Sequence, residues 1–165
     1  DGFRLVAAMN PFDAVGTARI ASAVYDRCCR VAVDYQDHDD EVRIVQRAAP
    51  VAAESLGTTA VAAAVSMVRD SREHPDLRTG SSVRGAIDFV MVAHELAALR
   101  RAEVTDPTVT LDAAQLALSG RIRLREGGSR TPEQIVAELW ERHFAPAEPA
   151  PETAGGEDDP PSGKA

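Results

Sequence analysis

Residues 73–100, with the sequence EHPDLRTGSSVRGAIDFVMVAHELAALR, decide the fold class of this chain. The second half of this stretch, from Ala86 to Leu99, is apolar on more than one side. One helical stripe contains Ile87, Val90 and Met91, and another contains Phe89, Val92, Leu96 and Leu99. A helix with apolar residues on several sides has to be covered by other elements. We therefore expect a helix over 86–99 at the centre of a helical bundle.

The residues just before this helix form a candidate anion site. Gly80 ends the preceding element, Ser81 or Ser82 can cap the helix, and Arg84 then falls in the first turn. A helix N-terminus attracts anions through its free N–H groups and its dipole, so an added arginine makes a clamp for phosphate. The alternative is that Arg84 simply points into solvent.

Further helices are predicted on both sides of this stretch. The first begins at Asp37, because acidic residues fill its first turn and arginines come later along the axis, as the helix dipole favours. Pro50 ends that helix, and Gly57 interrupts the segment that follows it. Valines at helical spacing then predict another helix that stops near His74.

The C-terminal third reads as two more helices and a tail. Residues 105–110 are expected to form a loop that contains Pro107, with a helix from Leu111 to about Gly120. A second helix starts at Thr131, because proline at the next position is preferred in a first turn. Between them, arginines at 121, 123 and 125 alternate with apolar residues; in an acidic chain without interleaved aromatics they are expected to face solvent rather than nucleic acid. Residues 146–165 are acidic and rich in proline, so we expect a disordered tail.

The N-terminal stretch 3–30, FRLVAAMNPFDAVGTARIASAVYDRCCR, has a different pattern. Phe3 to Met9 is a nearly continuous apolar run, which is typical of a strand covered on both faces. Asn10 and Pro11 follow directly. Ligands of open α/β sheets gather beyond the carboxyl ends of strands, where an amide can orient a water molecule or contact a phosphate oxygen. The alternative is that Asn10 only opens a turn.

Arg27 lies at a junction between two elements in the same stretch. Residues 17–26 have helical spacing, and an apolar segment resumes at Cys28. A guanidinium at such an edge can reach the γ-phosphate bound by a neighbouring subunit and stabilise the charge of phosphoryl transfer. Arg30 is a competing candidate for this role. The alternative is an exposed ion pair of Arg27 with Asp26 or another nearby acid.

These segments together resemble the distal half of a MoxR-type AAA+ ATPase module. FRLVAAMNPFDAVGT is similar to the strand that carries the family's sensor 1 asparagine, so the resemblance makes Asn10 the sensor 1 candidate. AVYDRCCRV resembles the arginine-finger segment, which assigns that role to Arg27, and residues 73–100 resemble the sensor 2 helix, which assigns that role to Arg84. The chain departs from the family at Cys28, where an aromatic or aliphatic residue is usual, and at Val83, where proline is common.

The resemblance implies a mainly α fold with a short α/β part. It implies that residues 1–36 are the distal part of the AAA+ α/β core and contribute the last strands of its parallel sheet. Residues 37–145 would then form the helical linker and the helical-bundle lid, and residues 146–165 the acidic tail.

The functional expectations follow from the same resemblance. No Gly-x-x-x-x-Gly-Lys-Ser/Thr loop occurs in the sequence, and no apolar strand ends in an acidic pair before residue 3, so the phosphate cradle and the magnesium ligand are missing. We therefore expect a fragment that neither binds ATP tightly nor hydrolyses it alone. Within a ring ATPase, expected to be a hexamer, it would contribute to ATP binding and to Mg²⁺-dependent hydrolysis that drives chaperone-like remodelling, with a von Willebrand A-domain protein as an associated partner. The alternative is a non-catalytic helical interaction or adaptor domain.

The composition of the chain excludes several classes of function. The net charge of −8 and the pI of about 5.0 argue against a general nucleic-acid or anionic-membrane binder. No apolar run reaches transmembrane length, and nothing resembles a signal peptide, so a cytoplasmic location is expected. Cys28 and Cys29 are adjacent and do not form a Cys-x-x-Cys pattern, and the histidines lack ligand-like spacing, so no metal site is predicted.

Overall fold

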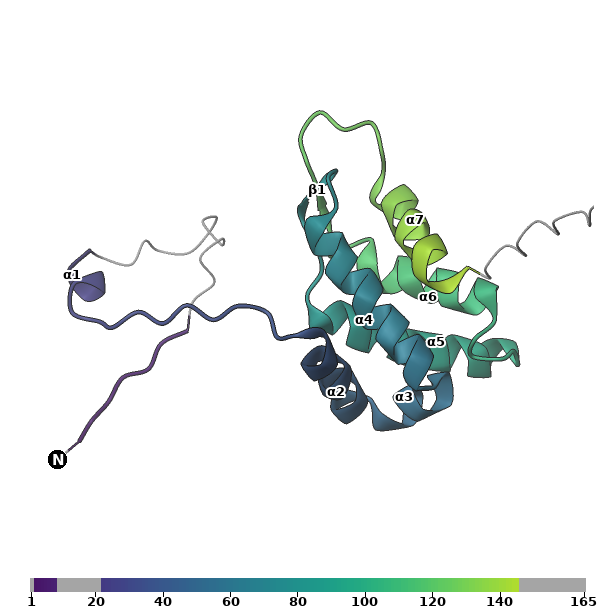
Figure 1. The fold of residues 1–165 in the computed structure, drawn as a ribbon, viewed down its shortest axis with the longest axis horizontal. Coiled ribbons are helices and arrows are strands. Elements are labelled where there is room, and N and C mark those ends of the chain that lie inside the picture. Colours follow the sequence, from purple (N-terminus) through teal and green to yellow (C-terminus); the bar gives the residue numbers. More distant parts are fainter. Residues whose placement is uncertain (1, 9–21, 146–165) are drawn as a thin grey trace, which may run out of the picture. The chain divides into compact units, whose positions relative to one another are not determined.

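A computed structural model describes residues 2–8 and 22–145 (Figure 1). The chain divides into two compact units, of which the first spans Asp1–Tyr35 and the second begins at Gln36.

Among its described residues, the first unit contains one short helix, α1, at Ser22–Tyr25. The strand predicted from Phe3 does not form in residues 2–8, which have no regular secondary structure. Phe3 is 94% exposed and Val6 is 92% exposed. An apolar strand is stable only when neighbouring strands take its hydrogen bonds and other layers cover its faces, and the described residues of this unit supply neither. Asn10 lies outside the described residues.

The second unit is mainly helical, as predicted. Its helices are α2 (His38–Ala48), α3 (Pro50–Leu56), α4 (Thr58–Glu73), α5 (Val83–Arg100), α6 (Pro107–Leu118) and α7 (Pro132–Phe144). Two short strands, β1 (Leu77–Thr79) and β2 (Arg123–Leu124), form an antiparallel pair with Leu77 opposite Leu124 and Thr79 opposite Arg123. The prediction of a parallel sheet is therefore wrong for the part of the chain that the structure describes.

Local sequence signals explain where most helices begin. Asp37 caps α2, since its carboxylate accepts a hydrogen bond of 2.8 Å from the backbone N–H of Asp40. Gly57 has a φ of +86° and separates α3 from α4, a conformation that costs glycine little. Thr131 and Gln134 form a reciprocal capping box at the start of α7.

Helix α6 begins earlier than predicted, which corrects the loop expected at residues 105–110. Asp106 is the N-cap, and its carboxylate accepts hydrogen bonds from the backbone N–H and the hydroxyl of Thr108. Pro107 occupies the first helical position, where its missing N–H costs nothing. The proline that we expected inside a loop therefore starts the helix.

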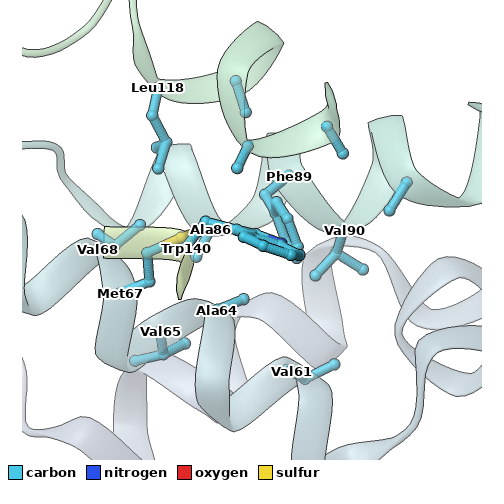
Figure 2. Close-up of a cluster of buried hydrophobic side chains, with 14 of the residues drawn as sticks. Val61, Ala64, Val65, Met67, Val68, Ala86, Phe89, Val90, Leu118 and Trp140 are labelled. Atoms are coloured by element: carbon cyan, nitrogen blue, oxygen red, sulfur yellow. The ribbon is translucent and has the colours of Figure 1, made fainter. Parts of the chain in front are cut away.

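Helix α5 is the central helix of the bundle, as the double apolar stripe predicted. It packs against α2, α3, α4 and α6. Ala86, Phe89, Val90 and Ala93 are completely buried. Figure 2 shows the buried side chains of α4, α5, α6 and α7 gathered in one core. The small residues that dominate this core let the helices approach closely, and the ring of Phe89 lies 5.1 Å from that of Phe144.

The alternating segment 121–125 supplies a core residue and exposed charges. Ile122 is 2% exposed and belongs to the core, whereas Arg121, Arg123 and Arg125 are exposed. The prediction of solvent-facing arginines is therefore confirmed. The strand itself covers only Arg123 and Leu124, and its partner β1 has only three residues.

Candidate functional site

The turn from β1 into α5 carries Arg84 and is packed tightly against α4. A Cβ added to Gly80 would lie 2.4 Å from the carbonyl oxygen of Ser71 and 2.5 Å from the backbone nitrogen of Arg72. Contacts this short do not occur for real Cβ atoms, so only glycine lets the turn approach the helix backbone so closely.

Two hydrogen bonds from α4 hold the next residue of the turn. Ser81 is 2% exposed, and its backbone N–H donates to the hydroxyl of Ser71 over 2.9 Å. The Ser81 carbonyl accepts from Nε of Arg72, also over 2.9 Å. The polar backbone groups of this buried residue are thus both satisfied by α4, which fixes the turn in place.

Gly85 packs on the other side of the turn. A Cβ at this position would lie 2.2 Å from the hydroxyl oxygen of Ser81 and 2.6 Å from Cδ2 of Leu118 in α6. The start of α5 is therefore confined between α4 and α6. Ser82 is the N-cap by position, but its side chain makes no capping hydrogen bond, so the packing takes over the role that we assigned to a serine cap.

Arg84 extends into solvent from the first turn of α5. It has no hydrogen bond or ion pair with any residue that the structure describes. The nearest acid on the same helix face, Asp88, is bonded instead to Arg121. The result is a cation that is not neutralised by a partner, at the positive end of an 18-residue helix.

A buried carboxylate lies behind this turn. Glu41 in α2 is completely buried and accepts from Arg72 at 2.7 and 3.3 Å and from Arg69 at 3.1 Å. Arg72 is itself 12% exposed at the side chain. A buried carboxylate needs such partners, because an unpaired charge in the interior is very costly. Sequence reasoning placed Glu41 only in a helical first turn, since the partner arginines lie about thirty residues away along the chain.

Arg27 lies in the first unit and is exposed. Its Nη1 donates to the carbonyl oxygen of Ala23 over 2.8 Å, which is a local bond at the end of α1. The expected alternative, an ion pair with Asp26, is not formed. Arg30 is also exposed and lies in an irregular segment. Arg84 lies in the second unit, so the described candidates divide between the two units.

Sequence reasoning missed a cluster of charges between α4 and α7. Glu138 accepts from Arg130 at 2.6 Å and from Arg142 at 3.1 Å, and His74 Nε2 lies 3.6 Å from it. The hydrogen bond from Arg130 holds the pKa of Glu138 below its ordinary value, and the same contact raises the pKa of Arg130. These residues line a cavity of about 360 Å³. Only the spacing of Glu138 and Arg142 signalled any part of this cluster in the sequence.

Residues 70 and 143 extend this cluster toward the end of α7. Asp70 accepts from His143 at 2.9 Å and from Arg142 at 3.3 Å. Acids and bases largely neutralise one another here, so we read the cluster as a clamp that holds α7 on α4. Among the described residues, no group of three or more histidine, cysteine or acidic side chains is arranged to hold a metal ion.

Comparisons with protein-family models, with curated proteins and with solved structures find no match for this chain. Within residues 2–8 and 22–145, no single helix has the length and apolar character needed to cross a membrane. In the same residues, only α3 and α4 taken together have this length and apolar character, and the two helices are bent by 105° at their junction.

Proposed function

We propose that this chain is the C-terminal part of a MoxR-type AAA+ ATPase module, in which α2–α7 form the helical linker and the lid. The observation that carries this proposal is Arg84, an exposed arginine that lies in the first turn of a long central helix and has no partner among the described residues. In this proposal Arg84 is the sensor 2 residue, Arg27 the arginine finger and Asn10 the sensor 1 residue.

The chemistry of Arg84 suits a nucleotide phosphate. Its guanidinium presents several N–H donors, and the unsatisfied N–H groups at the start of α5 add positive potential. Hydrogen bonds from a charged donor to phosphate are about twice as strong as neutral ones. Arg84 would thus bind the phosphates of ATP from the lid side and report their presence to the bundle through α5.

The described residues do not fit Mg²⁺, because they contain no suitable group of ligands. In this proposal the metal and most of the nucleotide are bound by residues outside this chain. The ion supplies charge neutralisation during phosphoryl transfer when it is bound. Among the described residues Arg27 bonds only to the Ala23 carbonyl, through one of its five N–H donors, and in this proposal the others reach a phosphate on a neighbouring subunit.

The wider proposal follows the family resemblance. The complete enzyme would act as a cytoplasmic ring, expected to be a hexamer, which uses ATP hydrolysis for chaperone-like remodelling of proteins. A von Willebrand A-domain protein is the proposed partner.

The test uses the full-length protein that contains this chain. Its coding sequence upstream of Asp1 should specify a phosphate-binding loop and an acidic strand end. Arg84→Ala should weaken ATP binding by about tenfold or more, since it removes a charged hydrogen bond. Arg27→Ala should abolish turnover while leaving ATP binding largely intact. Arg47→Ala is the matched control, because Arg47 is also exposed and unpaired among the described residues but lies at the end of α2.

A second function remains in view because the second unit has a hydrophobic core of its own. Such a bundle could serve as a non-catalytic helical interaction or adaptor domain. ATP binding and turnover that are absent, or that are indifferent to both arginine substitutions, would favour this function. If Arg27→Ala retains ATP turnover while Arg84→Ala loses it, then Arg30 is the arginine finger or the chain contains no arginine finger.

A further inference from the structure

A buried network of charged side chains from α2 and α4 holds the start of α5, which has no side-chain N-cap hydrogen bond. Arg72 donates to the Ser81 carbonyl through Nε and to Glu41 through its two Nη atoms. One planar guanidinium therefore joins the completely buried carboxylate of α2 to the backbone just before Arg84.

The Glu41 carboxylate also pairs with a second arginine, Arg69, which does not contact the turn before α5. Arg69 donates to Glu41 over 3.1 Å and to the carbonyl of Gln36 over 2.9 Å. Gln36 is the first residue of the second unit. Arg69 and Arg72 are thus chemically alike and share one counter-charge, but only Arg72 contacts the turn that leads into α5.

We infer that Glu41 and Arg72 are positioning residues for Arg84. This inference rests on the proposed function, in which Arg84 binds an anion. Glu41 fixes the plane of the Arg72 guanidinium, and Arg72 then fixes the Ser81 carbonyl, three residues before Arg84. Gly80 brings the turn close to the backbone of α4, and Gly85 brings the start of α5 close to the Leu118 side chain. The backbone that carries Arg84 is therefore already ordered before an anion binds, so little conformational entropy is lost on binding.

The two arginines provide a matched pair of variants. Lysine carries its donors on one nitrogen instead of three, so Arg72→Lys cannot reproduce the planar fork that spans Glu41 and the Ser81 carbonyl. Arg69→Lys weakens the same carboxylate pair but leaves the Ser81 contact in place. Both variants keep the positive charge beside Glu41, and exchange in α7, outside this network, shows whether either variant loosens the whole bundle.

The first measurement is amide hydrogen exchange in the 165-residue chain. Exchange at Ser81 and Gly85 should rise about tenfold in Arg72→Lys, because one hydrogen bond from a charged donor is lost. Arg69→Lys should leave these amides unchanged, and Leu139 in α7 should exchange alike in both variants. Equal exchange at Ser81 and Gly85 in the two variants would overturn the inference. If Arg72→Lys does not fold, the isosteric Glu41→Gln replaces it and should accelerate the same amides.

The second measurement is an NMR titration of the same chain with tripolyphosphate as the probe. Arg84→Ala should remove the shift changes at the start of α5. Arg72→Lys should weaken them several-fold and have no further effect in the presence of Arg84→Ala. Additive effects of the two substitutions would refute positioning. Absence of any response at Arg84 in the unsubstituted chain would count against the proposed function instead, and the exchange result would then decide the positioning claim alone.

Discussion

Replacing Gly80 by alanine should destabilise the bundle, whereas the same change at Gly120 should not. Neither glycine has a positive φ, so alanine can adopt both backbone conformations and only the surroundings differ. A Cβ at position 80 would meet three backbone atoms of Ser71 and Arg72 at 2.4 to 2.5 Å. A Cβ at position 120 would meet nothing within 4 Å.

The size of the effect follows from what has to move. The contacts at position 80 involve helix backbone, which cannot rotate away as a side chain can, so the turn has to shift outward by about an ångström. That shift stretches the two bonds of 2.9 Å from Ser71 and Arg72 to Ser81. Overpacking typically costs about 1–3 kcal/mol, and two weakened hydrogen bonds cost about 1–2 kcal/mol together. The expected loss is therefore roughly 2–5 kcal/mol.

Thermal unfolding followed by circular dichroism measures this loss. A bundle of this size should lose about 4 °C in Tm per kcal/mol, so Gly80→Ala should lower the Tm by roughly 8–20 °C. Gly120→Ala should change stability by less than about 1 kcal/mol and is the control for substitution at a glycine. A Tm for Gly80→Ala within a few degrees of that for Gly120→Ala would refute the argument that α4 and the turn are in close contact.

The remaining predictions concern the core and the charge clamp on α7. Phe89→Ala should cost about 3–5 kcal/mol, because the ring is completely buried beside Phe144, and the fluorescence of Trp140, the one tryptophan of the chain, will report unfolding in urea. A loss below about 1 kcal/mol would show that the site relaxes or is not packed as described. Glu138→Gln should destabilise the chain at pH 7, since Arg130 lowers the folded pKa of Glu138 below the ordinary 4.5. That contribution is complete above pH 4.5 and is lost as the pH falls through the lowered pKa, so the difference from the unsubstituted chain should close on acidification; a difference that widens at low pH would contradict it.

The helices were largely predictable because their signals are local. The double stripe of α5 marked a central helix, and the proline after Thr131 marked the start of α7. The start of α6 was missed, since Asp106 and Pro107 signal both a turn and a helix start. The strand expected from Phe3 does not form in residues 2–8, because a run of apolar residues indicates only a preference for burial and cannot supply the neighbouring strands.

The candidate site shows the same division between local and distant information. Sequence alone identified Arg84 and its place in a first turn, because capping and charge patterns depend on near neighbours. Only the tertiary structure decided that its turn is held by Arg72 and Glu41. These partners come from α4 and α2, and the choice of partner for a buried charge depends on which distant side chains the packed helices bring within hydrogen-bonding distance. The sequence by itself therefore determined a helical bundle and the place of Arg84 in the first turn of its central helix, while packing decided which distant residues hold the turn before it.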